Sequence, residues 1–283
     1  MDLMDIINKG RLNNDPAYSY IFGARFGTII QDAYTKDDVS DIVGALDDLC
    51  NPKTIDWGWA SSGIYSFWNY ETRELLYIGL AVNFAERFKQ HNGIISSRPS
   101  SCKYKKITEY FNSNEKLGYY ILTMPSVCQP VIRKNIEGIF EGKKVELSDF
   151  NHEQFKKDVK LVEVILIESY RKTFGQLPPW NEVKGSIEGA SRSTKGNYKI
   201  VEGFTTSNTH HPLVAKCTLR ELKGNIHYAY EEFLDKFRQF MLTHGTSFNE
   251  ALEQVLKDSG GKDEVYNLII RDDYMLKTLN LNK

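Results

Sequence analysis

Two short runs of aromatic and aliphatic residues, separated by a polar stretch, constrain the fold of this chain more than any other feature. The first run is Gly63–Trp68 and the second is Leu75–Leu80. Such a pair predicts two antiparallel strands joined as a hairpin. Because successive side chains of a strand point to opposite faces, Tyr65 and Tyr77 can be brought to the same side of the sheet.

A helix and a third strand are predicted directly after this hairpin. Asn83 and Glu86 have the spacing of a helix-starting capping box, and Gly93 is placed to end that helix. The run Leu117–Met124 is rich in strand-forming residues and is followed by Pro125, which terminates a strand. We therefore expect an α+β fold, in which a small three-stranded antiparallel sheet is flanked by helices.

Composition and charge restrict the class of protein. The chain has 283 residues, of which 41% are hydrophobic and 26% are charged, as is ordinary for a globular protein. A net charge of −1 argues against indiscriminate coating of nucleic acid, but it leaves room for a local basic groove. No apolar run approaches the ~20 residues of a membrane span. The four cysteines are isolated from one another, and the N-terminus lacks the features of a signal peptide, so we expect a reduced, cytoplasmic protein.

Three regions are expected along the chain. Residues 1–57 read as a helical extension, with apolar faces over Ile21–Ile30 and Val39–Leu49. Residues 58–183 hold the sheet, interrupted by an insertion near 126–152 that carries its own short helix. Residues 184–283 combine a linker, which we expect to be a loop over 184–200, with C-terminal helices.

Two features of the C-terminal region have a structural explanation and a functional one. Aromatic residues from Tyr230 to Phe240 recur at helical spacing, which favours a core or oligomer interface over a base-stacking surface. The pair His210-His211 lacks a third metal ligand at useful spacing, so a surface turn is expected there.

The predicted helix after the hairpin carries residues suited to phosphate chemistry. Arg87 and His91 are four residues apart and share one helix face. The planar, permanently charged guanidinium of arginine matches a phosphate group, and histidine can move a proton or hold a water molecule. Taken alone, His91 is better explained as a helix-end histidine, and ordinary cross-strand packing is the alternative explanation for Tyr65 and Tyr77.

A late carboxylate offers a metal ligand. Glu168 follows an apolar run in a predicted helix over Val159–Thr173, where a charged group needs a partner. A hard divalent cation, held by one carboxylate, by water and by substrate phosphate, would be such a partner. The other explanation is an ion pair of Glu168 with Arg171 or Lys172.

The order of these elements resembles the GIY-YIG nuclease family. The triplets Gly63-Ile64-Tyr65 and Tyr77-Ile78-Gly79 are both intact, and the helix with Arg87 and His91 follows them. The resemblance covers residues 58–183 and leaves both ends unexplained. It implies that Tyr65 activates the attacking water, that Tyr77 orients water or phosphate, that Arg87 stabilises the transition state and that His91 assists proton transfer or holds the base.

The resemblance also implies a metal site. Glu168 would bind a single Mg²⁺ or Mn²⁺ ion, and Asn181, at the end of the turn Pro178–Asn181, would brace the site. The long segment between the third strand and Glu168 departs from the minimal family module. For this reason Glu163 is kept as the alternative metal ligand.

The function that the resemblance implies is metal-dependent endonucleolytic cleavage of double-stranded DNA. The compact plan, with helices built around the module, is most similar to the stand-alone type II restriction endonucleases of the family, which usually act as oligomers, so a homodimer is expected. The alternatives are a homing or phage-type nuclease with a modular DNA-binding tail, and an inactive nucleic-acid-binding module. Residues expected to contact DNA are the cations of two basic loops: Arg98, Lys103, Lys105, Lys106, Arg192 and Lys195.

Overall fold

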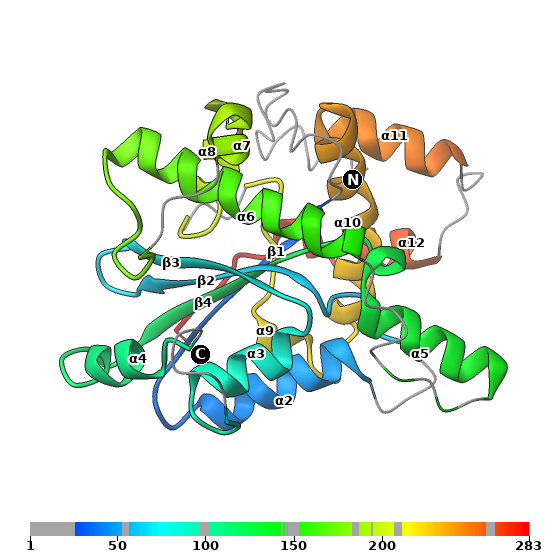
Figure 1. The fold of residues 1–283 in the computed structure, drawn as a ribbon. Helices are drawn as coiled ribbons and strands as arrows, with labels where there is room; N and C mark the ends of the chain where they lie inside the picture. Colours follow the sequence, from blue (N-terminus) through cyan, green and yellow to red (C-terminus); the bar gives the residue numbers. More distant parts are fainter. Residues whose placement is uncertain are drawn as a thin grey trace.

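The fold is a mixed α+β arrangement in which an antiparallel sheet lies between two groups of helices (Figure 1). It is seen in a computed structural model, and no helix among the residues it describes is long and apolar enough to cross a membrane. The described residues are 26–52, 57–96, 102–142, 144, 146, 153–182, 187–193, 195–206, 211–258 and 264–282.

Four strands and a set of helices make up the described part of the chain. The strands are β1 (Ile29–Tyr34), β2 (Gly63–Asn69), β3 (Leu75–Ala81) and β4 (Leu117–Thr123). The helices are α2 (Val39–Cys50), α3 (Phe84–His91), α4 (Tyr104–Tyr110), η3 (Ser126–Cys128), α5 (Pro130–Glu141), α6 (Glu153–Phe174), α7 (Ile187–Arg192), α8 (Lys195–Glu202), α9 (Leu219–Leu222), α10 (His227–His244), α11 (Phe248–Asp258), α12 (Glu264–Arg271) and η5 (Tyr274–Leu276).

The sheet has four strands in the order β1-β4-β2-β3, and every neighbouring pair is antiparallel. The expected α+β class is confirmed, whereas the expected three-stranded sheet is wrong by one strand. The additional strand, β1, comes from the segment expected to be a helical extension. The described part of this extension therefore does not stand apart from the sheet, since β1 pairs with β4 along its whole length.

The misreading of β1 has a physical cause. All six of its residues are buried, so the strand shows no alternation of apolar and polar positions. Phe26, Ile29 and Ile30 have helical spacing by coincidence. The two polar residues that interrupt the strand have partners far away in the sequence, because Gln31 Nε2 donates to Gly203 O at 2.8 Å and Asp32 pairs with Arg220 at 2.9 Å. The second half of the extension is helical as expected, in α2; residues 1–25 lie outside the described part.

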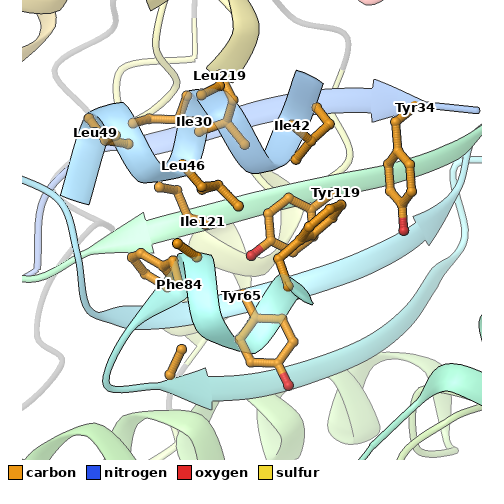
Figure 2. Close-up of a cluster of buried hydrophobic side chains, with 14 of the residues drawn as sticks. Ile30, Tyr34, Ile42, Leu46, Leu49, Tyr65, Phe84, Tyr119, Ile121 and Leu219 are labelled. Carbon is orange, nitrogen blue, oxygen red and sulfur yellow. The ribbon is translucent and has the colours of Figure 1, made fainter. Parts of the chain in front are cut away.

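The two faces of the sheet bury different sets of side chains. Ile64 and Trp68 of β2 face α6 and α8, and Tyr65 and Phe67 face α2, α3 and α4 (Figure 1). Figure 2 shows the second face, where Tyr65 and Tyr119 lie among aliphatic residues of α2 and of the strands. The alternation within the hairpin thus separates the side chains that pack against α6 and α8 from those, Tyr65 among them, that face α2, α3 and α4.

The C-terminal half is built into the sheet. The Asp235 carboxylate of α10 accepts hydrogen bonds from Thr28 N and Thr28 Oγ1, both at 2.8 Å, and from Thr123 Oγ1 at 3.0 Å. The expected loop over 184–200 contains α7 and α8 instead. The expected short helix of the insertion near 126–152 is α5. His211, placed in a surface turn from the sequence, is buried with an exposed fraction of 7%.

Candidate active site

Tyr65 is the centre of a polar cluster on the face of the sheet that α3 covers. It lies directly opposite Gly79 in the β2–β3 pair, and its ring extends from β2 toward β3 (Figure 2). A Cβ atom at position 79 would approach the Tyr65 hydroxyl to 2.7 Å and Tyr77 Cε1 to 2.6 Å. The glycine of the second triplet therefore makes room for the two phenol rings.

His91 contacts the Tyr65 hydroxyl. Its Nε2 atom lies 2.6 Å from Tyr65 Oη, and its Nδ1 atom accepts a hydrogen bond from Lys103 N at 2.9 Å. Burial, with the charges of Arg87 and Lys103, lowers the pKa of His91 to about 3, so the ring is neutral at physiological pH. A neutral imidazole that accepts at Nδ1 carries its proton on Nε2, and His91 therefore donates to Tyr65.

Arg87 is the second donor to the same oxygen. Its Nε atom lies 3.2 Å from Tyr65 Oη, and its Nη1 atom donates to Gln90 Oε1 at 2.9 Å. Arg87 and His91 were predicted to share one face of the helix, and they do, because both side chains of α3 contact the Tyr65 hydroxyl. Gln90 was missed from the sequence, although its place three residues after Arg87 on a helix is the signal that would have found it.

Tyr77 completes the tyrosine pair. The Tyr65 and Tyr77 rings lie 5.8 Å apart, and their hydroxyl groups influence each other's pKa. The Tyr65 oxygen thus has two nitrogen partners, His91 and Arg87, and lies beside Tyr77. Burial raises the pKa of Tyr65 well above its usual value, while Arg87 lowers it. Tyr65 is therefore neutral in this cluster, and the N–H groups of His91 and Arg87 that point at its oxygen would stabilise a negative charge there.

The open edge of β3 is held by the segment around Asn181. The side chain of Asn181 accepts from Ile78 N at 3.0 Å and donates to Ile78 O at 2.8 Å, and Trp180 N donates to Leu76 O at 2.8 Å. Because Ile78 lies between Tyr77 and Gly79, this bracket fixes the part of β3 that carries the second tyrosine. Asn181 is thus placed to support the tyrosine pair through the β3 backbone.

Glu168 and Glu163 lie on different sides of α6. The Glu168 carboxylate is paired with Arg171, with Oε2 2.8 Å from Nε and Oε1 2.6 Å from Nη2. Val164 and Lys172, one turn on either side of Glu168, contact Gly189 and the Ala190 carbonyl of α7. Glu168 therefore lies on the α7 side of the helix, and the ion pair with Arg171 that the sequence offered as an alternative is present.

Glu163 faces the tyrosine cluster. A separation of five residues turns its side chain by about 140° from Glu168 around the helix. The carboxylate accepts a hydrogen bond from the Leu80 backbone at the edge of β3, and it interacts electrostatically with Tyr77 and Arg87. Burial raises the pKa of Glu163 to about 7, although Leu80 N–H and the charges of Arg87 and Lys160 lower it.

The Glu163 carboxylate is the kind of oxygen ligand that a hard divalent cation binds. Within the described ranges, no group of three or more His, Cys, Asp or Glu side chains comes together as a metal centre. Mg²⁺ is commonly held by one or two carboxylates, with water and substrate phosphate filling its remaining positions. A carboxylate whose ionisation is resisted by burial gains from such a partner, whereas both oxygens of Glu168 are already engaged by Arg171.

The described residues that were expected to contact DNA lie on both faces of the sheet, and only some of them are near the tyrosine cluster. Lys105 and Lys106 are exposed at the start of α4, close to the cluster, and Lys103 is partly buried with its ammonium 5.0 Å above the Tyr77 ring. Arg192 ends α7, on the other face of the sheet. Lys195 begins α8, and its side chain is not described; Arg98 lies outside the described residues.

Comparison of the chain with protein-family models, with curated proteins and with solved structures yields no match.

Proposed function

We propose that this protein is a metal-dependent DNA endonuclease that hydrolyses phosphodiester bonds with the Tyr65 cluster. The observation that carries the proposal is the convergence of His91 Nε2 and Arg87 Nε on one buried tyrosine oxygen, next to the ring of Tyr77. A tyrosine needed only for packing requires none of these partners. Tyr119, on the same face, is buried without any hydrogen-bond partner for its hydroxyl in the described structure.

The cluster has the parts that phosphodiester hydrolysis requires. In the proposed reaction the attacking water gives a proton to the pair of Tyr65 and Tyr77, and the partly exposed Tyr77 releases a proton to solvent. The two N–H donors of His91 and Arg87 stabilise the negative charge that develops on Tyr65 during this transfer. Arg87 also has a guanidinium available to the phosphate oxygens beside it.

Glu163 is the proposed metal ligand, in place of Glu168. Its position beside Tyr77 and Arg87, and the absence of an ion pair on its carboxylate within the described part of the structure, support this choice. When bound there, Mg²⁺ or Mn²⁺ would neutralise charge on the scissile phosphate and on the leaving oxygen.

Among DNA endonucleases, we propose a stand-alone type II restriction endonuclease that acts as a homodimer on a short double-stranded site. The packing of α10 against β1 and β4 through Asp235, Thr28 and Thr123 supports this reading. A homing or phage-type enzyme would carry a separable DNA-binding tail, and these buried contacts join the C-terminal half to the sheet. An inactive binding module would have no need of the intact Tyr65 partners.

The test is incubation of wild-type protein and its Tyr65→Phe variant with unmethylated supercoiled plasmids and long linear DNA in Mg²⁺. Discrete double-strand fragments that are lost in the variant are expected. Relaxed circles without linear product would instead indicate a nicking enzyme. The absence of wild-type cleavage on every DNA and RNA tested would overturn the enzyme proposal.

A further inference from the structure

A hollow lies beside the tyrosine cluster, between the end of α3 and the start of α4. Its volume is about 550 Å³, and its walls combine apolar and polar side chains, among them Gln90, Ile95 and Tyr104. Ile95 and Tyr104 are exposed to 38% and 48%, which is unusual for side chains of this size. The hollow therefore presents an apolar surface to solvent next to a site proposed to act on DNA.

The Tyr104 ring is held in place as one wall of this hollow. It packs on Gly93, which ends α3 with a φ of +74°, and a Cβ atom there would lie 2.6 Å from Tyr104 Cε2. Tyr104 also lines a second hollow of about 370 Å³, with Lys36 and Phe111. The ring thus contacts Gly93, borders both hollows and is 48% exposed, so part of it is open to a flat group.

The charged side chains around the hollow are mostly lysines, which can bind a phosphate group. Lys103, Lys105 and Lys106 line it, and the one carboxylate among its described lining residues is Glu182, whose Oε1 lies 3.7 Å from the Lys103 ammonium. Lys105 and Lys106 are exposed. An aromatic wall next to exposed lysines is the pattern that single-stranded nucleic acid uses for its bases and its backbone.

Two residues that line the hollow also contact the tyrosine cluster. Gln90 lines it and accepts the hydrogen bond from Arg87 Nη1 at 2.9 Å. Lys103 lines it, donates its backbone N–H to His91 and places its ammonium over the Tyr77 ring. A DNA strand whose phosphate contacts Arg87 therefore has its neighbouring nucleotide within reach of the hollow.

We propose that this hollow receives one nucleotide of the bound DNA strand, unstacked from its neighbours, with the base against Tyr104 and the adjoining phosphate beside Lys105 and Lys106. The proposal rests on the endonuclease function in naming DNA as the ligand. It adds that the enzyme distorts its substrate next to the bond it cuts. Extrusion of a nucleotide is the means by which an otherwise stacked base reaches a protein pocket.

The experiment uses a single-stranded pentanucleotide with 2-aminopurine at its centre, whose fluorescence is quenched by stacking on an aromatic ring. It is titrated with full-length protein without divalent cation, so that binding is read without cleavage. Quenching is expected with wild type and with Tyr104→Phe, which keeps the ring. Tyr104→Ala is expected to weaken binding by about tenfold or more and to lose the quenching.

Two further variants control this experiment. Phe174→Ala removes an aromatic residue of similar exposure, 52%, at the end of α6 and is expected to leave binding and quenching unchanged. Lys105→Ala combined with Lys106→Ala is expected to weaken binding and to make it less dependent on salt, while the quenching at saturation is kept. Equal binding and quenching by wild type and Tyr104→Ala would overturn the proposal.

Cleavage assays on the same proteins separate this proposal from the proposed function. Tyr104-dependent quenching without cleavage of any DNA would retain the nucleotide site and overturn the nuclease. Cleavage of DNA by a wild-type protein that shows no Tyr104-dependent quenching would retain the nuclease and overturn the nucleotide site.

Discussion

Tyr65 and His91 are joined by a hydrogen bond of 2.6 Å between the phenol oxygen and the Nε2 atom of the imidazole. The ring of His91 is buried and neutral, and its other nitrogen is occupied by the backbone N–H of Lys103. The direction of the bond is therefore fixed, with histidine as donor and tyrosine as acceptor. This arrangement favours negative charge on the Tyr65 oxygen, and in the proposed reaction it would make His91 the residue that holds the base.

Tyr65→Phe is expected to lower the rate of DNA cleavage by about 10²–10⁴-fold, the usual contribution of a general acid or base. It also leaves two buried N–H donors without an acceptor, at a cost of about 1–3 kcal/mol in the free energy of unfolding. Single-turnover cleavage and urea unfolding measure the two effects. Tyr119→Phe is the matched control, because it removes a buried hydroxyl that has no partner on the same face; an equal loss of activity in both variants would contradict the role of Tyr65.

Arg87→Ala is expected to reduce turnover by about 10²-fold or more while DNA affinity changes little, because its charge acts on the transition state. Cleavage rates and fluorescence anisotropy of labelled DNA measure the two quantities. Lys89→Ala is the control on the same helix, since Lys89 pairs with Asp47 at 2.8 Å away from the cluster. If affinity and turnover fall equally in Arg87→Ala, Arg87 is a docking residue.

Glu163→Gln and Glu168→Gln distinguish the two candidate metal ligands. Glu163→Gln is expected to raise the Mg²⁺ concentration needed for half-maximal cleavage by about 10-fold or more, because a neutral amide is a poor ligand for a hard cation. Glu168→Gln is expected to lower stability, through loss of the buried pairing with Arg171, with little change in the Mg²⁺ requirement. The reverse result would restore Glu168 as the ligand.

The cleavage rate is expected to rise with pH through a midpoint near 7 at low Mg²⁺, because the pKa of Glu163 is raised to about 7 and only the ionised carboxylate binds the cation. Higher Mg²⁺ should move this midpoint to lower pH, since the cation competes with the proton. Cleavage rates measured over a grid of pH and Mg²⁺ concentration test this. A midpoint that is independent of Mg²⁺ would assign the titration to another group.

His91 is expected to make the protein less stable as the pH falls. The pKa of His91 is about 3 in the folded state and 6.5 in the reference state, so between these values the unfolded chain binds the extra proton. Stability from this group is complete above pH 6.5 and is lost as the pH falls toward 3, with a limiting slope of about 1.4 kcal/mol per pH unit.

Urea unfolding of wild type and His91→Gln between pH 4 and pH 7 measures this slope, which should be smaller in the variant. Glu163 contributes the opposite slope between 4.5 and about 7, and it cancels in the comparison because both proteins contain it. His211→Gln is a second comparison, since burial lowers the pKa of His211 to about 4. An unchanged slope in His91→Gln would show that His91 is not the group that resists protonation.

Local sequence patterns predicted the elements that lie around the candidate site. The β2–β3 hairpin, the capped helix α3 and the strand β4 are each specified by residues within a few positions of one another, such as Asn83, whose side chain accepts from Glu86 N at 3.1 Å. β1 was missed because the partners of its polar residues Gln31 and Asp32 are Gly203 and Arg220, far away in the sequence. No local pattern contains that information.

The same distinction applies to the site. The sequence by itself determined that Tyr65 and Tyr77 can share a face of the sheet and that Arg87 and His91 share a face of one helix, whereas their meeting in one cluster was implied only by the family resemblance. Only the tertiary structure separates the positions of Glu163 and Glu168, since the rotation of α6 over the sheet is set by packing between residues far apart in the chain. It turns Glu163 to the edge of β3 and Glu168 toward α7.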